Sequence, residues 1–273
     1  MKKVFSLFAL CLMACASVLL TSANKKPRRL FMAGDSTMAD KTELDISPER
    51  GWGQVFPSFL TEDIIVENHA MNGRSTKSFL AEHRWDSILA RSHKSDIVII
   101  QFGHNDQKTD DPVRYASIET YENNLILMTE QAKKKGLQVI LCTPISRRAF
   151  NKHTGEFIHK HGGYPEAVRR VARRMEVPLL DLEAATAEWL TELGDEESKQ
   201  YFMNVAPGEC EKFPDGKTDN THLRENGAMK VAAMAAKMID EQKIKCLIKN
   251  IIPDATEPKY TTFCRPEFKS DKK

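Results

Sequence analysis

The chain has 273 residues, and its 40 Lys and Arg side chains nearly balance 38 Asp and Glu, giving a formal net charge of +2. This balance argues against nucleic acid as a partner, because nucleic-acid-binding domains carry a clear basic excess. Without a short leader, the length suits one α/β domain of about 250 residues.

The N-terminus has the layout of a secretory signal peptide. Met1 is followed by two lysines, residues 4–20 are apolar, and residues 21–23 are small. This pattern predicts a signal peptide over residues 1–23, and therefore a secreted or periplasmic protein. An uncleaved anchor and a lipid-modified Cys15, which would place the protein at the cell envelope, are the alternatives. The domain is then expected over residues 24–245, with a C-terminal tail over 246–273.

Apolar runs and helical periodicity alternate along the rest of the chain. Strands are predicted over residues 29–33, 64–68, 96–102, 139–142 and 178–182. Helices are predicted over residues 52–60, 85–92, 115–132, 164–175, 184–193 and 223–244, with a long polar loop over 194–220 before the last of them. This alternation predicts a parallel sheet with helices on both faces.

A Gly34-Asp35-Ser36 tripeptide follows the first predicted strand directly. Ligands bind at the carboxyl ends of strands in open α/β sheets, so Ser36 is well placed to face a crevice. A serine hydroxyl needs a base to become a nucleophile, and these three residues alone also suit an ordinary turn.

Three further motifs lie where they could complete such a site. Gly73 follows the second strand and can aim its backbone N–H at a ligand. Asn105 follows the third strand and offers a side-chain NH₂ group. Asp219 and His222 precede the last helix, where the aspartate could orient the imidazole. Taken singly, these motifs also suit a turn, a loop opening and a helix cap.

Together the four motifs supply every part that acyl transfer needs. Ser36 is the predicted nucleophile, His222 its base and Asp219 the orienting group. The N–H groups of Ser36 and Gly73 and the side chain of Asn105 form the predicted oxyanion hole. This chemistry requires no cofactor.

The same blocks resemble the SGNH (GDSL-type) hydrolases: Gly34-Asp35-Ser36, Gly73, the run from Gly103 to Asp106, and Asp219 with His222. The amino-acid sequences of residues 67–79, 102–106 and 143–148 are similar to those of rhamnogalacturonan acetylesterases. The resemblance implies a flavodoxin-like three-layer α/β/α fold with a five-stranded parallel sheet. It also implies removal of acetyl groups from an acetylated pectic polysaccharide or oligosaccharide through an acetyl-enzyme. Activity on xylan or other acyl esters, and a non-catalytic carbohydrate-binding role, are the alternatives.

Basic residues near these blocks are candidate substrate contacts. Arg147 and Arg148 follow the fourth strand, and one of them could grip a uronate carboxylate. Arg74 could add positive potential beside Gly73, and His104 could shape the site. Each of the three arginines could instead be a solvated surface charge.

The histidine and cysteine spacings predict no metal site. His153, His159 and His161 form a small cluster without an ordinary ligand pattern. Cys142 lies in an apolar run and is expected to be a buried thiol. Cys246 and Cys264 could form a disulfide that ties down the tail, and no pairing is predicted for Cys210.

Overall fold

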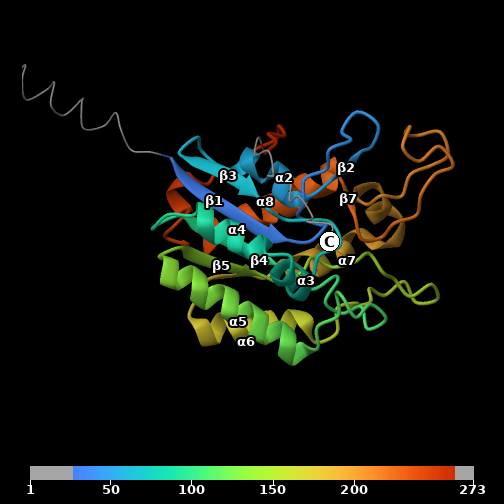
Figure 1. Cartoon of the computed structure of the whole chain (residues 1–273). Helices are drawn as coiled ribbons and strands as arrows, with labels where there is room; N and C mark the ends of the chain where they lie inside the picture. Colours follow the sequence, from blue (N-terminus) through green and yellow to red (C-terminus); the bar gives the residue numbers. More distant parts are fainter. Residues whose placement is uncertain (1–26, 262–273) are drawn as a thin grey trace, which may run out of the picture.

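The computed structural model describes residues 27–261, and its centre is a sheet of five parallel strands (Figure 1). The strands are β1 (Arg28–Gly34), β3 (Ile64–Asn68), β4 (Ile97–Gln101), β5 (Gln138–Cys142) and β6 (Leu179–Leu180). Their order across the sheet is β3-β1-β4-β5-β6. This is the flavodoxin-like order, so the predicted fold class is confirmed.

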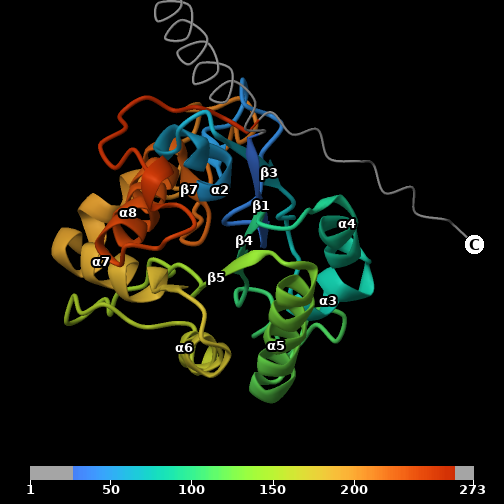
Figure 2. The same ribbon diagram turned by 90° about the vertical axis from the view of Figure 1, so that its left-hand side faces the viewer.

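Both faces of the sheet are buried, and alternate residues of β1 separate the two cores. Leu30 and Met32 face one core, whereas Phe31 and Ala33 face the other. Side chains of a strand alternate between faces, and the continuous apolar runs therefore supply both layers. Figure 2 shows α7 and α8 on one side of the sheet and α3, α4 and α5 on the other.

The helices cover the sheet much as their periodicity predicts. The bounds are α2 (Trp52–Val55), α3 (Thr76–Ala81), α4 (Arg84–Arg91), α5 (Ile118–Lys135), α6 (Tyr164–Met175), α7 (Leu182–Ser198) and α8 (Glu225–Glu241). A 3₁₀ turn over Phe56–Phe59 continues α2, with Pro57 in its first turn. Gly136 ends α5 in a left-handed conformation with φ of 86°, which glycine adopts without steric cost.

Several predicted boundaries are wrong, and one helix is missing from the prediction. The loop expected from residue 194 begins later, because α7 continues to Ser198 past a kink at Gly194 and is followed by a 3₁₀ turn over Lys199–Tyr201. The predicted strand over 178–182 shrinks to β6, since Leu182 already belongs to α7. Helix α3 was not predicted at all. The last helix starts at Glu225, because Leu223–Arg224 forms β7.

Strand β7 pairs antiparallel with β2 (Glu49–Arg50), a short strand in a segment for which no strand was predicted. Glu49 lies opposite Arg224 in this pair. The pairing attaches the chain just before α2 to the chain just before α8. It therefore links two segments that are far apart in the sequence beside the carboxyl edge of the sheet.

The described part of the C-terminal segment packs on the domain rather than extending from it. It contains a 3₁₀ turn at Ile248–Asn250, and Ile251 forms a β-bridge with Leu60. Cys142, Cys210 and Cys246 are free thiols, and Cys142 is buried as expected. The predicted signal peptide, Cys15 and Cys264 lie outside the described residues. Across residues 27–261, no helix combines the length and apolarity needed to cross a bilayer.

Candidate active site

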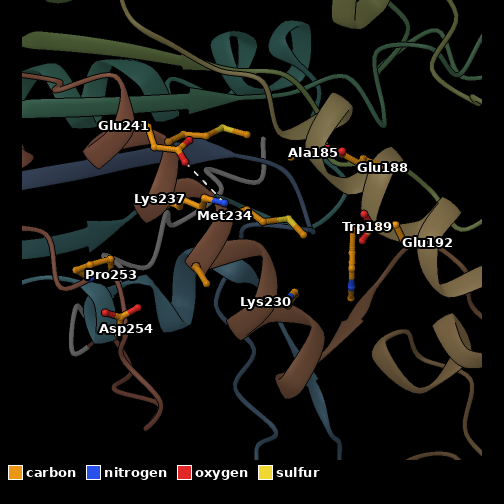
Figure 3. Close-up of a pocket in the computed structure, with 12 residues that line it drawn as sticks. Ala185, Glu188, Trp189, Glu192, Lys230, Met234, Lys237, Glu241, Pro253 and Asp254 are labelled. Carbon is orange, nitrogen blue, oxygen red and sulfur yellow. Dashed lines mark ion pairs between the residues drawn. The ribbon is translucent and has the colours of Figure 1, made fainter.

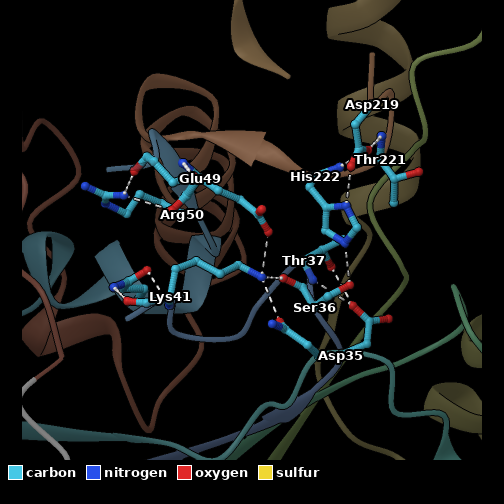
Figure 4. A network of polar contacts seen from close by, with 12 residues as sticks. Asp35, Ser36, Thr37, Lys41, Glu49, Arg50, Asp219, Thr221 and His222 are labelled. Carbon is cyan, nitrogen blue, oxygen red and sulfur yellow. Dashed lines mark hydrogen bonds and ion pairs between the residues drawn. The ribbon is translucent and has the colours of Figure 1, made fainter. Parts of the chain in front are cut away.

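Ser36, His222 and Asp219 form a continuous hydrogen-bonded chain at the carboxyl edge of the sheet (Figure 4). Ser36 Oγ lies 2.8 Å from His222 Nε2, and His222 Nδ1 lies 2.8 Å from Asp219 Oδ2. Ser36 follows β1, whereas the other two residues precede β7. The fold thus brings together side chains that stand 186 residues apart in the sequence.

The carboxylate of Asp219 is held in one orientation by the turn that precedes β7. Its Oδ1 accepts the backbone N–H groups of Thr221 at 2.9 Å and of His222 at 3.0 Å. Its Oδ2 faces His222 and also Lys217 Nζ at 3.0 Å. Burial opposes ionisation of Asp219, but the hydrogen bonds and charge of His222 hold its pKa well below the usual range. The group is therefore an anion that can stabilise a positively charged imidazole.

The predicted oxyanion donors lie on loops beside Ser36. Gly73 has a φ of 78° after β3, a left-handed conformation. Asn105 Nδ2 donates to Arg74 O at 3.0 Å, which ties the loop after β4 to the loop of Gly73. One amide hydrogen of Asn105 is used in this bond. The second hydrogen of the NH₂ group remains to serve an oxyanion.

A buried polar chain lies beneath Ser36. Thr37 donates its N–H and its hydroxyl to Asp35 Oδ1, at 3.0 and 2.8 Å. Gln101 Nε2 donates to Thr37 Oγ1 at 2.8 Å and is in turn held by Trp52 Nε1. Complete burial raises the pKa of Asp35. These contacts fix the turn that presents the serine.

His104 and Arg147 lie next to this site. His104 is 2% exposed, and its ring meets that of His161 edge-on at 4.5 Å between centroids. Burial, and then the charge of Arg147, lower the pKa of His104 well below its usual value, so the ring is neutral. Arg147 Nη2 donates to His104 O at 3.0 Å. The Arg147 guanidinium forms no ion pair with a carboxylate of residues 27–261.

Arg148 and Arg74 have internal partners. Arg148 is 6% exposed, and its guanidinium donates to Ser198, Asn220 and Asp195. Arg74 donates from Nε to Glu82 at 3.0 Å and from Nη1 to Asn72 O at 2.9 Å. These contacts give Arg148 a structural position between α7 and the loop of Asp219. Of the two adjacent arginines, Arg147 is the one left to meet a substrate.

Two of the three clustered histidines, His159 and His161, contact different partners. His159 bonds to Glu183, whereas His161 bonds to Ile145 O and Gln107. No group of three or more His, Cys, Asp or Glu side chains within residues 27–261 is arranged to hold a metal ion.

A cavity of about 540 Å³ lies between α7 and α8, away from the triad (Figure 3). Trp189, Met234 and Lys237 contribute to its lining, and none of the triad or oxyanion residues does. A smaller hollow of about 400 Å³ adjoins Gly73 and Arg74. This hollow adjoins one of the predicted oxyanion donors, Gly73.

Two lysines at the site were missed by the sequence reasoning. Lys217 contacts Asp219, and Lys41 Nζ donates to Ser36 O at 2.7 Å. Both lie within polar loops of mixed charge. Proximity in sequence to the motifs, two residues for Lys217 and five for Lys41, was the only available signal.

The three-layer fold and the Ser-His-Asp geometry together define an ester hydrolase. The chain belongs to the GDSL-like lipase/acylhydrolase family, whose sequence profile it matches over residues 32–228. This result confirms the resemblance inferred from the motifs, and the chain is a carboxylic ester hydrolase.

Two relatives from Bacillus subtilis are similar over most of the chain. It is 41% identical to rhamnogalacturonan acetylesterase RhgT of Bacillus subtilis over 217 residues, covering 80% of this chain and 91% of RhgT. It is 35% identical to the probable rhamnogalacturonan acetylesterase YesY of the same organism, covering 78% and 92%.

Solved structures agree with the fold. The YxiM protein of Bacillus subtilis superposes with a TM-score of 0.68 at 26% identity, covering 80% of this chain and 57% of that chain. A catalytic mutant of Axe2, an acetylxylan esterase from Geobacillus stearothermophilus, gives 0.55 at 18% identity, covering 79% and 95%. The relatives support acetylesterase activity, whereas the likeness to Axe2 supports the fold.

Proposed function

We propose that this protein is a serine acetylesterase that removes O-acetyl groups from rhamnogalacturonan. The hydrogen-bonded chain from Ser36 through His222 to Asp219 is the observation that carries the proposal. The similarity to RhgT over most of both chains supports the acetyl group and the pectic substrate.

The geometry suits a two-step reaction. Ser36 Oγ attacks the acetyl carbonyl carbon while His222 Nε2 takes the serine proton. Two backbone N–H groups, those of Ser36 and Gly73, and Asn105 Nδ2 receive the oxyanion, and His222 returns the proton to the departing sugar oxygen. Water then attacks the acetyl-enzyme, with His222 again as base. Acetate leaves, and Ser36 Oγ recovers its proton.

Turnover of a small chromogenic acetate by the wild type and by Ser36→Ala tests the chemistry. We expect Ser36→Ala to lose at least about a thousand-fold in kcat, since a triad without its nucleophile retains only residual catalysis. Equal rates for the two proteins would refute the nucleophile assignment. A wild type that does not turn over the ester would favour a carbohydrate-binding role.

Arg147 is the proposed contact for a galacturonate carboxylate. Burial lowers the pKa of Arg147, which is expected for a cation that lacks a close counter-ion. A uronate carboxylate would supply that counter-ion, and guanidinium binds it in bidentate geometry. Arg74 and His104 are proposed only to shape the site. Arg148 is not a proposed substrate contact, because its guanidinium is held by Ser198, Asn220 and Asp195.

Arg147→Gln should raise KM for acetylated rhamnogalacturonan about tenfold or more, because a hydrogen bond to a charged group contributes about 1.5–3 kcal/mol. Rates on a neutral acetate ester and on acetylated xylan should change little. Lys152→Gln, which removes an exposed charge from the same loop, is the matched control. An equal loss on all three substrates would contradict uronate binding by Arg147.

We further propose that the protein is exported, on the basis of the basic and apolar N-terminus. Intact mass of the protein recovered outside the cytoplasm tests this. A mass equal to that of the chain starting at Asn24 would support cleavage after Ala23. A mass that includes a lipid on Cys15 would instead support an envelope lipoprotein.

A further inference from the structure

Lys41 is a nearly buried cation beside the nucleophile (Figure 4). Its Nζ donates to Ser36 O at 2.7 Å and to the side chain of Asn72 at 2.8 Å. It also forms an ion pair with Glu49 Oε1 at 3.0 Å. The Lys41 side chain is 9% exposed and that of Glu49 is 13% exposed. A lysine this deeply placed is unusual unless its charge is compensated.

The backbone of Lys41 is fixed from both sides by one side chain. Lys41 N donates to Gln54 Oε1 at 3.0 Å, and Gln54 Nε2 donates back to Lys41 O at 3.0 Å. Gln54 belongs to α2 and is 3% exposed. The ammonium group therefore extends from a rigid mount, and its position is not that of a freely moving surface lysine.

The two groups that Lys41 Nζ joins adjoin two separate oxyanion donors. Ser36 contributes its own N–H from the loop after β1. Asn72 immediately precedes Gly73, whose N–H comes from the loop after β3. Backbone hydrogen bonds continue the pairing of the two segments beyond the ladder, from His69 N to Met32 O at 2.8 Å and from Met71 N to Gly34 O at 3.0 Å. This pairing stops short of Ser36 and Asn72, which Lys41 Nζ bridges.

We infer that Lys41 is a positioning residue that locks the two backbone donors of the oxyanion hole at their working separation, with Glu49 as its anchor. This inference rests on the proposed function of Ser36. Oxyanion donors act through their preset aim, and small displacements of such groups are costly. A single ammonium that bridges both loops supplies that aim.

Glu49 extends the lock to the catalytic base. It lies in β2 opposite Arg224 of β7, two residues beyond His222. Burial opposes ionisation of Glu49, but Lys41 and, after it, His222 lower its pKa, so the anchor is charged. The ion pair thus joins the loops of Ser36 and Asn72 to the strand that follows the base.

Lys41→Met tests the inference, since it keeps an unbranched side chain as far as the ε position and removes the ammonium. With a small neutral acetate ester, we expect kcat to fall about 10- to 100-fold with KM within about threefold of wild type. Inhibition by a boronic acid, which forms a tetrahedral adduct with the serine, should weaken in parallel with kcat. Glu49→Gln should give a smaller loss of the same kind.

Lys212→Met is the matched control, because Lys212 pairs with Glu43 at the surface of the neighbouring loop, and it should behave as wild type. Lys41→Met with wild-type kcat, or with reduced kcat and unchanged boronate inhibition, would overturn the inference. If Lys41→Met does not fold, unchanged kcat and inhibition in Glu49→Gln would do so. An active Ser36→Ala would instead refute the proposed function.

Discussion

The buried carboxyl of Asp106 should make the stability of the protein fall as pH rises towards neutrality. Its Oδ1 accepts the N–H of Thr76 at 2.9 Å and the Thr76 hydroxyl at 2.5 Å. Its Oδ2 is buried and has no hydrogen-bond partner within residues 27–261. Burial, opposed by the bonds from Thr76 and assisted by the charge of Asp35, raises the pKa of Asp106 to about 7.

The sign and size of the effect follow from linkage. The unfolded value is 3.8, so between about pH 4 and pH 7 the folded protein binds a proton that the unfolded chain does not. Stability therefore falls with rising pH across this window and levels off above it. A rise of about three pKa units corresponds to at most about 4 kcal/mol. Asp106→Asn keeps the acceptor for Thr76 and removes the titrating group.

Urea unfolding of the full chain at pH 5 and pH 8 measures this contribution. The stability of Asp106→Asn, relative to the wild type, should increase by about 2–3 kcal/mol from pH 5 to pH 8, since about two of the three pKa units lie above pH 5. Asp96→Asn is the matched control, because Asp96 is a buried carboxyl at the opposite end of β4 whose oxygens accept backbone N–H groups of Arg29 and His93. An unchanged pH dependence in Asp106→Asn would refute the reasoning.

Three further substitutions separate catalysis from folding. Asp219→Asn keeps an acceptor for the turn but favours the wrong tautomer of His222. We expect kcat to fall about 10³- to 10⁴-fold, with an unfolding midpoint similar to that of the wild type. A loss in kcat below tenfold would contradict the assignment of the triad. The structure has room for the added methyl group of Gly73→Ala, since the new Cβ would lie 3.9 Å from Arg114 Nη1. Backbone strain of about 1 kcal/mol at the positive φ should lower kcat. Full activity at wild-type stability would contradict the role of the Gly73 backbone. Arg148→Met should cost about 1–3 kcal/mol, because it removes the guanidinium that donates to the buried Ser198 hydroxyl and to the Asn220 amide. An unchanged denaturation midpoint would exclude that structural role.

Much of the fold could be predicted because periodicity and burial are local signals here. Residues 64–68 and 164–175 were predicted to the residue, as a strand and as α6. The misses have a common cause. Strands β2 and β7 are two residues each and exist only because they pair with one another. Helix α3 starts at a capping box of Ser75 and Ser78 within a short polar stretch, too short for a periodic pattern.

The candidate site divides in the same way. The triad could be predicted from the sequence, because its chemistry requires those residue types next to strand ends and helix starts. Its members are Ser36, Asp219 and His222. The different roles of Arg147 and Arg148 could not be predicted, since two adjacent arginines cannot be distinguished in the sequence before their partners in the fold are known. Arg148 finds Asp195 and Asn220, which stand 47 and 72 positions away.

Lys41 is the extreme case of a role that exists only in the folded chain. Its bonds join the loop after β1 to the loop after β3, and its ion pair reaches a strand that forms only by pairing beside His222. No local pattern encodes such a bridge. A residue of this kind acts through the geometry of others, so its substitution should show in kcat and in affinity for a tetrahedral adduct before it shows in substrate binding.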